Sequence, residues 1–207
     1  MRLKPQNICN KAIVVVLLAF LVPLLHAQAL PARTAAIAQL QSMQIEPTVE
    51  RLLQFSADGD AVMVNRLLSA GISARAAVST RQVTALHNAA ALGHLKIVTL
   101  LIELGADPNA TDWRGATPLV NAAYGGHSAV VTYLAAHGAN VNVTGSKRSP
   151  LVSAVQANSL ETVVALLSLG ANPTQSDVDG QTPLAAAELA KRTAIVSRLR
   201  MAIGAVP

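Results

Sequence analysis

Histidines are the side chains of this sequence that could most readily do chemistry, because imidazole binds metals and transfers protons near neutral pH. Beyond residue 29 the histidines are His87, His94, His127 and His137. If His94 and His127 occupy equivalent positions of stacked units, as argued below, they lie roughly 8 to 10 Å apart. One ion with ligands at about 2 Å cannot bridge that gap. We therefore expect structural histidines, with no metal and no cofactor.

Patterns of other catalytic sites are missing from the sequence. Gly125-Gly126-His127-Ser128 lacks the Gly-x-Ser-x-Gly elbow of hydrolases, and neither a phosphate loop ending in Lys-Ser/Thr nor His-Glu-x-x-His occurs. The aspartate pairs Asp58/Asp60 and Asp177/Asp179 fall in expected turns, where aspartate bonds to local backbone. The sequence therefore predicts a non-enzymatic protein with no catalytic residues.

The N-terminus has the organisation of a secretory signal peptide. Arg2, Lys4 and Lys11 precede an apolar run over residues 12–25, and Ala27-Gln28-Ala29 matches a cleavage site. We predict a signal peptide over residues 1–29, cleaved between Ala29 and Leu30. The only cysteine, Cys9, leaves with it, so the mature chain has no disulfide. An uncleaved signal anchor is the alternative.

Removal of residues 1–29 also changes the charge that the sequence suggests. The whole chain has a net charge of +5, and without its first three basic residues it keeps 13 basic and 11 acidic side chains, a net charge of +2. Nucleic-acid binders carry a concentrated basic stripe. We therefore expect neither nucleic acid nor, after cleavage, a membrane as a partner.

A period near 33 residues organises the rest of the chain. The leucines that mark it, separated by 34, 33, 32 and 33 residues, are Leu52, Leu86, Leu119, Leu151 and Leu184. A second pair of landmarks recurs twelve residues apart, as Gly59/Gly71, Gly93/Gly105, Gly126/Gly138 and Asn158/Gly170. Such self-similarity is typical of repeat proteins, in which each unit buries its apolar face against its neighbours.

Local chemistry predicts two helices in each unit. Thr117-Pro118 and Thr182-Pro183 can begin a helix, because the hydroxyl caps free amides and proline tolerates the first turn. Gly126 can end that helix in the left-handed conformation. The apolar stripe Val130-Val131-Leu134 then predicts a second helix that faces a neighbouring unit.

These motifs resemble the ankyrin repeat. In one unit the resemblance rests on Thr84-Ala85-Leu86-His87, Gly93-His94 and Gly105-Ala106-Asp107. In the next unit it rests on Thr117-Pro118-Leu119, Gly126-His127 and Gly138-Ala139-Asn140. The two later units contribute Ser149-Pro150-Leu151 and Thr182-Pro183-Leu184. The resemblance implies an all-α solenoid of stacked helix-turn-helix units with short β-hairpin-like fingers. In the family the histidine at the position of His87 hydrogen-bonds to neighbouring backbone, and the resemblance implies the same for His87.

The repeat pattern divides the chain into segments. We expect an ankyrin-repeat domain over residues 49–202, followed by a tail over 203–207. Its units, the first and last of them caps, cover about 49–78, 79–111, 112–143, 144–176 and 177–202. Residues 30–48 are either a leader or an extra N-terminal helix. The finger around Gly145-Ser146-Lys147-Arg148 is one residue short and is expected to be distorted.

Ankyrin folds bind partners on the concave face, made by the finger tips and the exposed side of each first helix. Trp113, Arg114 and Tyr124 map to that face, and Trp, Tyr and Arg are enriched among binding hot spots. We predict that these three anchor a partner. The flanking residues are Arg81, Arg148 and Gln156. Alternatively, Trp113 only packs on the next finger. Phe55 and Tyr133 are expected in the core.

The resemblance extends to exported bacterial ankyrin-repeat proteins, some of which are associated with protection against peroxide through catalases. It implies a periplasmic monomer that binds a protein partner as an adaptor or stabiliser. The alternatives are an extracellular location and an immunity or inhibitor protein that occludes a secreted toxin or hydrolase.

Overall fold

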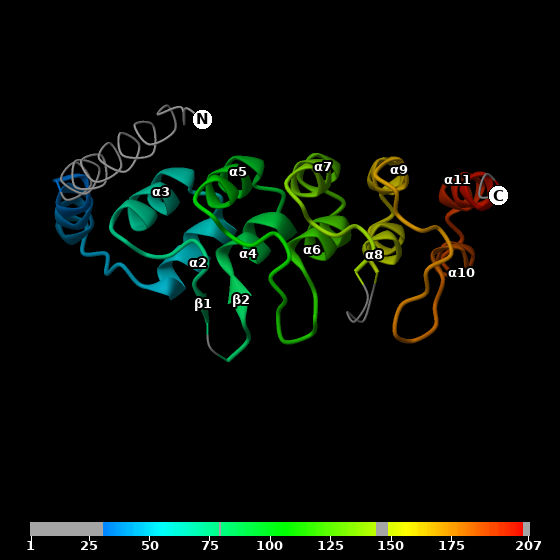
Figure 1. Cartoon of the computed structure of the whole chain (residues 1–207), viewed down its shortest axis with the longest axis horizontal. Helices are drawn as coiled ribbons and strands as arrows, with labels where there is room; N and C mark the ends of the chain where they lie inside the picture. Colours follow the sequence, from blue (N-terminus) through cyan, green and yellow to red (C-terminus); the bar gives the residue numbers. More distant parts are fainter. Residues whose placement is uncertain (1–30, 79, 144–148, 205–207) are drawn as a thin grey trace, which may run out of the picture.

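The computed structural model describes residues 31–78, 80–143 and 149–204. Pairs of antiparallel helices follow one another along a single axis (Figure 1). The pairs are α2 (Val49–Asp58) with α3 (Ala61–Ser69), α4 (Ala85–Ala91) with α5 (Leu95–Glu103), α6 (Pro118–Gly125) with α7 (Ser128–Ala136), α8 (Pro150–Gln156) with α9 (Leu160–Ser168), and α10 (Pro183–Leu189) with α11 (Thr193–Gly204). The predicted all-α repeat architecture is confirmed.

The first helices of the pairs form one layer and the second helices form another, with the fingers projecting beyond the first layer (Figure 1). Within the first layer α2, α4, α6, α8 and α10 pack in order, and the second helices do the same. Leu86, Leu119 and Leu151, which marked the period, are buried in one continuous core. Phe55 and Tyr133 are half-buried and pack against that core. Each unit therefore buries its apolar surface against the next.

Hydroxyl side chains cap the N-terminus of every first helix in the five pairs. The caps, which each accept a hydrogen bond from the backbone N–H three residues later, are Thr48, Thr84, Thr117, Ser149 and Thr182. Proline follows the cap in α6, α8 and α10, where its missing N–H costs nothing. The caps therefore fix where each unit begins.

Left-handed residues end the first helices, including two that are not glycine. Gly93 and Gly126 have φ of 76° and 75°, which confirms the conformation predicted for Gly126. Asn158 and Lys191 take the equivalent positions with φ of 55° and 54°. The last unit, which lacks the glycine, therefore keeps the turn between its helices at some cost in backbone strain.

Glycine at position 93 provides a test of this turn. A Cβ there would lie 2.5 Å from His127 Nδ1, whereas a Cβ at Gly138, whose φ of 89° is also positive, would meet nothing within 4 Å. Left-handed strain alone costs about 1–3 kcal/mol. We expect Gly93→Ala to lower the free energy of unfolding, measured with urea, by more than Gly138→Ala does. Equal losses would mean that the ring of His127 moves away freely.

Side chains also hydrogen-bond across the boundaries between units. His94 Nε2 donates to Ala57 O at 2.9 Å, and His127 Nε2 donates to Ala91 O at 3.1 Å. Asn109 Nδ2 donates to Gly138 O at 2.8 Å while its Oδ1 accepts from Asn140 N at 2.8 Å. Asn142 makes the same two bonds to Gly170 and Asn172. These bonds fix the register between successive units.

Residues 31–42 form a helix before the first unit. Ala36 and Leu40 are buried in the common core, and Arg33 Nε donates to Ala70 O at 3.1 Å. This helix therefore covers the open end of the first unit. The predicted signal peptide, with Ala29 and Leu30, lies outside the described residues, as do residues 144–148 of the third finger and the last residues of the tail.

Candidate functional site

The second finger, between α5 and α6, ends in a turn that one carboxylate closes. Asp112 Oδ1 accepts hydrogen bonds from Arg114 N at 2.8 Å and from Ala116 N at 2.9 Å. Asp112 N donates to Ala116 O at 2.9 Å, and Gly115 has a φ of 73°. Trp113 and Arg114 lie between the two ends of this turn and are exposed. The turn thus presents them at the finger tip.

The fourth finger, between α9 and α10, uses the same turn. Asp177 Oδ1 accepts from Asp179 N at 3.0 Å and from Gln181 N at 2.9 Å, and Gly180 has a φ of 77°. The first finger instead forms the short antiparallel hairpin of β1 (Ala77–Val78) and β2 (Val83–Thr84). That hairpin is the only β ladder in the described ranges. The predicted hairpin-like fingers are therefore of two kinds.

Trp113 is 59% exposed and is joined to two of the other predicted residues. The guanidinium carbon of Arg114 lies 4.5 Å from the centre of the Trp113 ring, a cation-π contact. Trp113 N donates to Arg81 O at 3.1 Å, which ties the second finger to the first. We call Arg81, Trp113 and Arg114 the finger cluster. The third finger, against which Trp113 could alternatively pack, includes Arg148, and its residues 144–148 lie outside the described residues.

Tyr124 and Gln156 lie in the first-helix layer. Both are the seventh residue of their helices, α6 and α8, and both are exposed, Tyr124 by 57%. Leu189, the seventh residue of α10, is 79% exposed. Leu189 was not among the predicted residues, although its place in the repeat could have revealed it. No hydrogen bond within the described part of the chain joins Gln156 to the finger cluster.

His87 supports the second finger from within the core. It is 1% exposed, and its Nε2 donates to Ala116 O at 3.1 Å, so the neutral ring accepts at Nδ1 from Thr84 N at 3.2 Å and from Thr84 Oγ1 at 2.8 Å. Burial lowers the pKa of His87 below 6.5, which favours the neutral ring. The bond to neighbouring backbone that the resemblance implies is confirmed.

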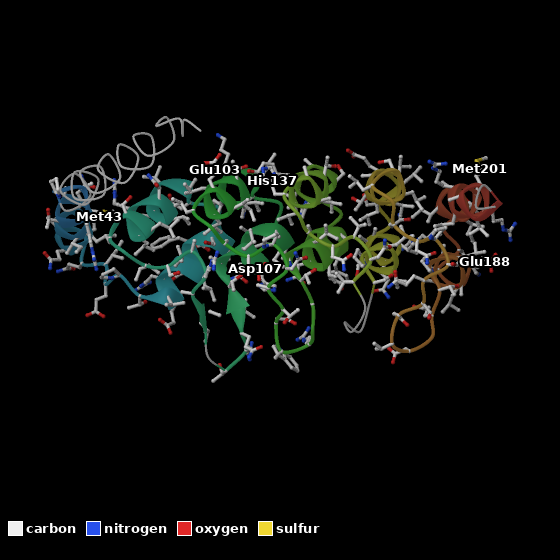
Figure 2. All side chains as sticks on the ribbon, viewed as in Figure 1. Met43, Glu103, Asp107, His137, Glu188 and Met201 are labelled. Carbon is white, nitrogen blue, oxygen red and sulfur yellow. The ribbon has the colours of Figure 1, made fainter. Side chains whose placement is uncertain are left out.

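A second surface, which the sequence analysis did not single out, lies on the second helices. A shallow hollow there is lined mainly by Leu95, Ala129, Tyr133, Glu161 and Val164, from α5, α7 and α9. His137 belongs to the same layer, on the opposite side from the fingers (Figure 2). It stacks on Tyr133 with ring centres 4.0 Å apart. This surface is separate from the predicted one.

Two further properties concern the described residues only. No group of three or more His, Cys, Asp or Glu side chains in residues 31–78, 80–143 and 149–204 could hold a metal ion. In the same ranges no helix combines the length and hydropathy needed to span a bilayer.

Comparison with known proteins identifies the repeats. A family model of the ankyrin repeat matches residues 81–113, and a model of three tandem ankyrin repeats matches residues 109–177. A probable E3 ubiquitin-protein ligase of Oryza sativa subsp. japonica, XBOS33, is 46% identical over 67 residues, which cover 32% of this chain and 13% of that protein. The chain therefore contains ankyrin repeats and folds as an all-α ankyrin-repeat solenoid.

Proposed function

We propose that this chain is an exported, non-enzymatic module that binds a protein partner in the bacterial periplasm, as an adaptor or stabiliser. Ankyrin repeats are in general protein-interaction modules. The observation that carries the proposal is the exposed tryptophan at the tip of a finger that backbone hydrogen bonds hold in place. Aromatic and arginine side chains that are ordered before binding are favoured as anchors. The N-terminal signal pattern supports export.

Replacement of the two exposed aromatic residues tests the site. Trp113→Ala/Tyr124→Ala is expected to reduce recovery of the partner at least about tenfold, as loss of hot-spot residues does. The measurement is crosslinked capture from the periplasm with the intact gene expressed in a Gram-negative host, followed by mass spectrometry. Circular dichroism should show unchanged helix content, because both side chains are exposed.

A matched control replaces two exposed leucines of the second-helix layer. Leu104→Ala/Leu160→Ala removes apolar surface away from the fingers and should leave recovery unchanged. Equal recovery of the partner by the wild type and both double variants would show that the binding site does not include Trp113 and Tyr124. Absence of the chain from the periplasmic fraction would refute export. Assay of the recovered partner distinguishes an adaptor from an inhibitor.

A further inference from the structure

The finger cluster is positioned before any partner arrives. Asp112 closes the turn around Trp113 and Arg114, Trp113 N donates to Arg81 O, and His87 Nε2 donates to Ala116 O at the base of the finger. Binding to such a surface loses little conformational entropy. The chemistry of the exposed groups, as they stand before binding, therefore indicates which kind of ligand the surface binds.

The charged groups of the cluster are cationic and have no ionic partner among the described residues. In the described part of the chain the only ion pair joins Arg200 to Glu188, at 2.8 Å in the last unit. Asp112 and Asp107 are the acidic residues of the second finger, and one oxygen of each already accepts backbone N–H groups. Arg81 and Arg114 are exposed. Their guanidinium groups are thus available to anions.

The contact between Arg114 and Trp113 adds specificity. A guanidinium that stacks on a ring face keeps its N–H donors at its edge, where they can bind a carboxylate in bidentate geometry. The ring of Trp113, 59% exposed, offers apolar surface next to those donors. The surface therefore suits a carboxylate close to an apolar side chain.

Charge changes along the row of fingers. The fourth finger has no arginine at its tip and carries Val178 and Asp179, both exposed. An acidic segment would thus be attracted to the first two fingers and repelled by the fourth. This difference also sets the position of such a segment on the solenoid.

We propose that the finger cluster binds an acidic segment of the partner protein, with carboxylates on Arg81 and Arg114 and an apolar side chain on Trp113. The proposal rests on the proposed protein-binding function. Peptides selected by the full chain from a random displayed library should be enriched in Asp and Glu beside an apolar residue. Because Trp113 is the only tryptophan, their binding should change its fluorescence.

Charge variants test the assignment. Arg81→Gln/Arg114→Gln should weaken binding of the best selected peptide at least about tenfold. Lys96→Gln/Lys191→Gln, which removes the same charge elsewhere on the surface, should change binding less than twofold, within about 0.4 kcal/mol. Binding to the wild type should also weaken as salt rises.

Several results would overturn the proposal. Selected peptides without excess acidic residues, but sensitive to Trp113→Ala, would refute the acidic partner and leave the protein-binding function standing. Equal competition by a single-stranded oligonucleotide would point to phosphate instead of carboxylate. Failure to enrich any peptide would count against both the acidic segment and the finger surface, whereas periplasmic capture would still test the function independently.

Discussion

Leu119→Ala is expected to lower the free energy of unfolding by about 2–5 kcal/mol, the range for truncation of a fully buried leucine. Leu119 is 0% exposed and lies in α6, which packs against both α4 and α8. In a repeat protein the stability approximates a sum of units and nearest-neighbour interfaces. A cavity in the middle unit therefore weakens the interfaces on both of its sides. Urea denaturation followed by circular dichroism measures the change.

Leu92→Ala provides the control for this prediction, because Leu92 is an exposed leucine of the preceding unit. Surface substitutions usually change stability by less than about 0.5 kcal/mol. If the two variants lost similar amounts of free energy, α6 would not occupy the packed position described here. A loss of cooperativity for Leu119→Ala alone would show that the two halves of the solenoid unfold separately.

His87→Ala is expected to lower the free energy of unfolding by about 2–4 kcal/mol, because it empties a buried site and removes hydrogen-bond partners from Thr84 and Ala116. His137→Ala is the control. That ring is exposed and, within the described residues, hydrogen-bonds only to Tyr133 O four residues earlier, so its loss should cost less than about 1 kcal/mol. A small loss for His87→Ala would mean that water replaces the ring.

The same histidine gives a pH dependence with a definite sign. Because burial lowers the pKa of His87 in the folded state, the unfolded chain binds the proton more readily. The contribution of neutral His87 to the free energy of unfolding is fully present above about pH 6.5 and is lost as the pH falls toward the pKa of His87 in the folded state. Denaturation at a series of pH values should show that the free energy of unfolding declines less steeply with falling pH in His87→Ala than in the wild type. Parallel profiles would contradict this assignment.

Most of the fold could be predicted because its signals are local and repeated. Thr117 and Ser149 cap helices, Gly126 ends one, and the period of the leucines fixes the stacking. The N-terminal helix could not be decided, because helical spacing does not show what a side chain packs against. In the structure Leu40 is buried whereas Met43, three residues later, is exposed.

Less of the candidate site could be predicted. Motif position placed Trp113 on a finger. Its stacking with Arg114 depends on the side-chain conformations within one turn, and its backbone bond to Arg81 depends on the distance between two fingers, neither of which the sequence gives. Leu189 was missed because the weak last unit was read as a polar cap. That Arg81 has no ionic partner among the described residues depends on three-dimensional packing, which the sequence does not show.

The bonds that Asn109 and Asn142 make to the next unit have a consequence for covalent modification. Asn109-Ala110-Thr111 and Asn142-Val143-Thr144 both match the acceptor pattern for N-linked glycans. A glycan is attached to the same amide nitrogen that donates to Gly138 or Gly170 in the stacked solenoid. In a eukaryotic secretory host, glycosylation and folding would therefore compete for one atom. The fraction of chains that carry a glycan would then record how slowly the neighbouring units came together.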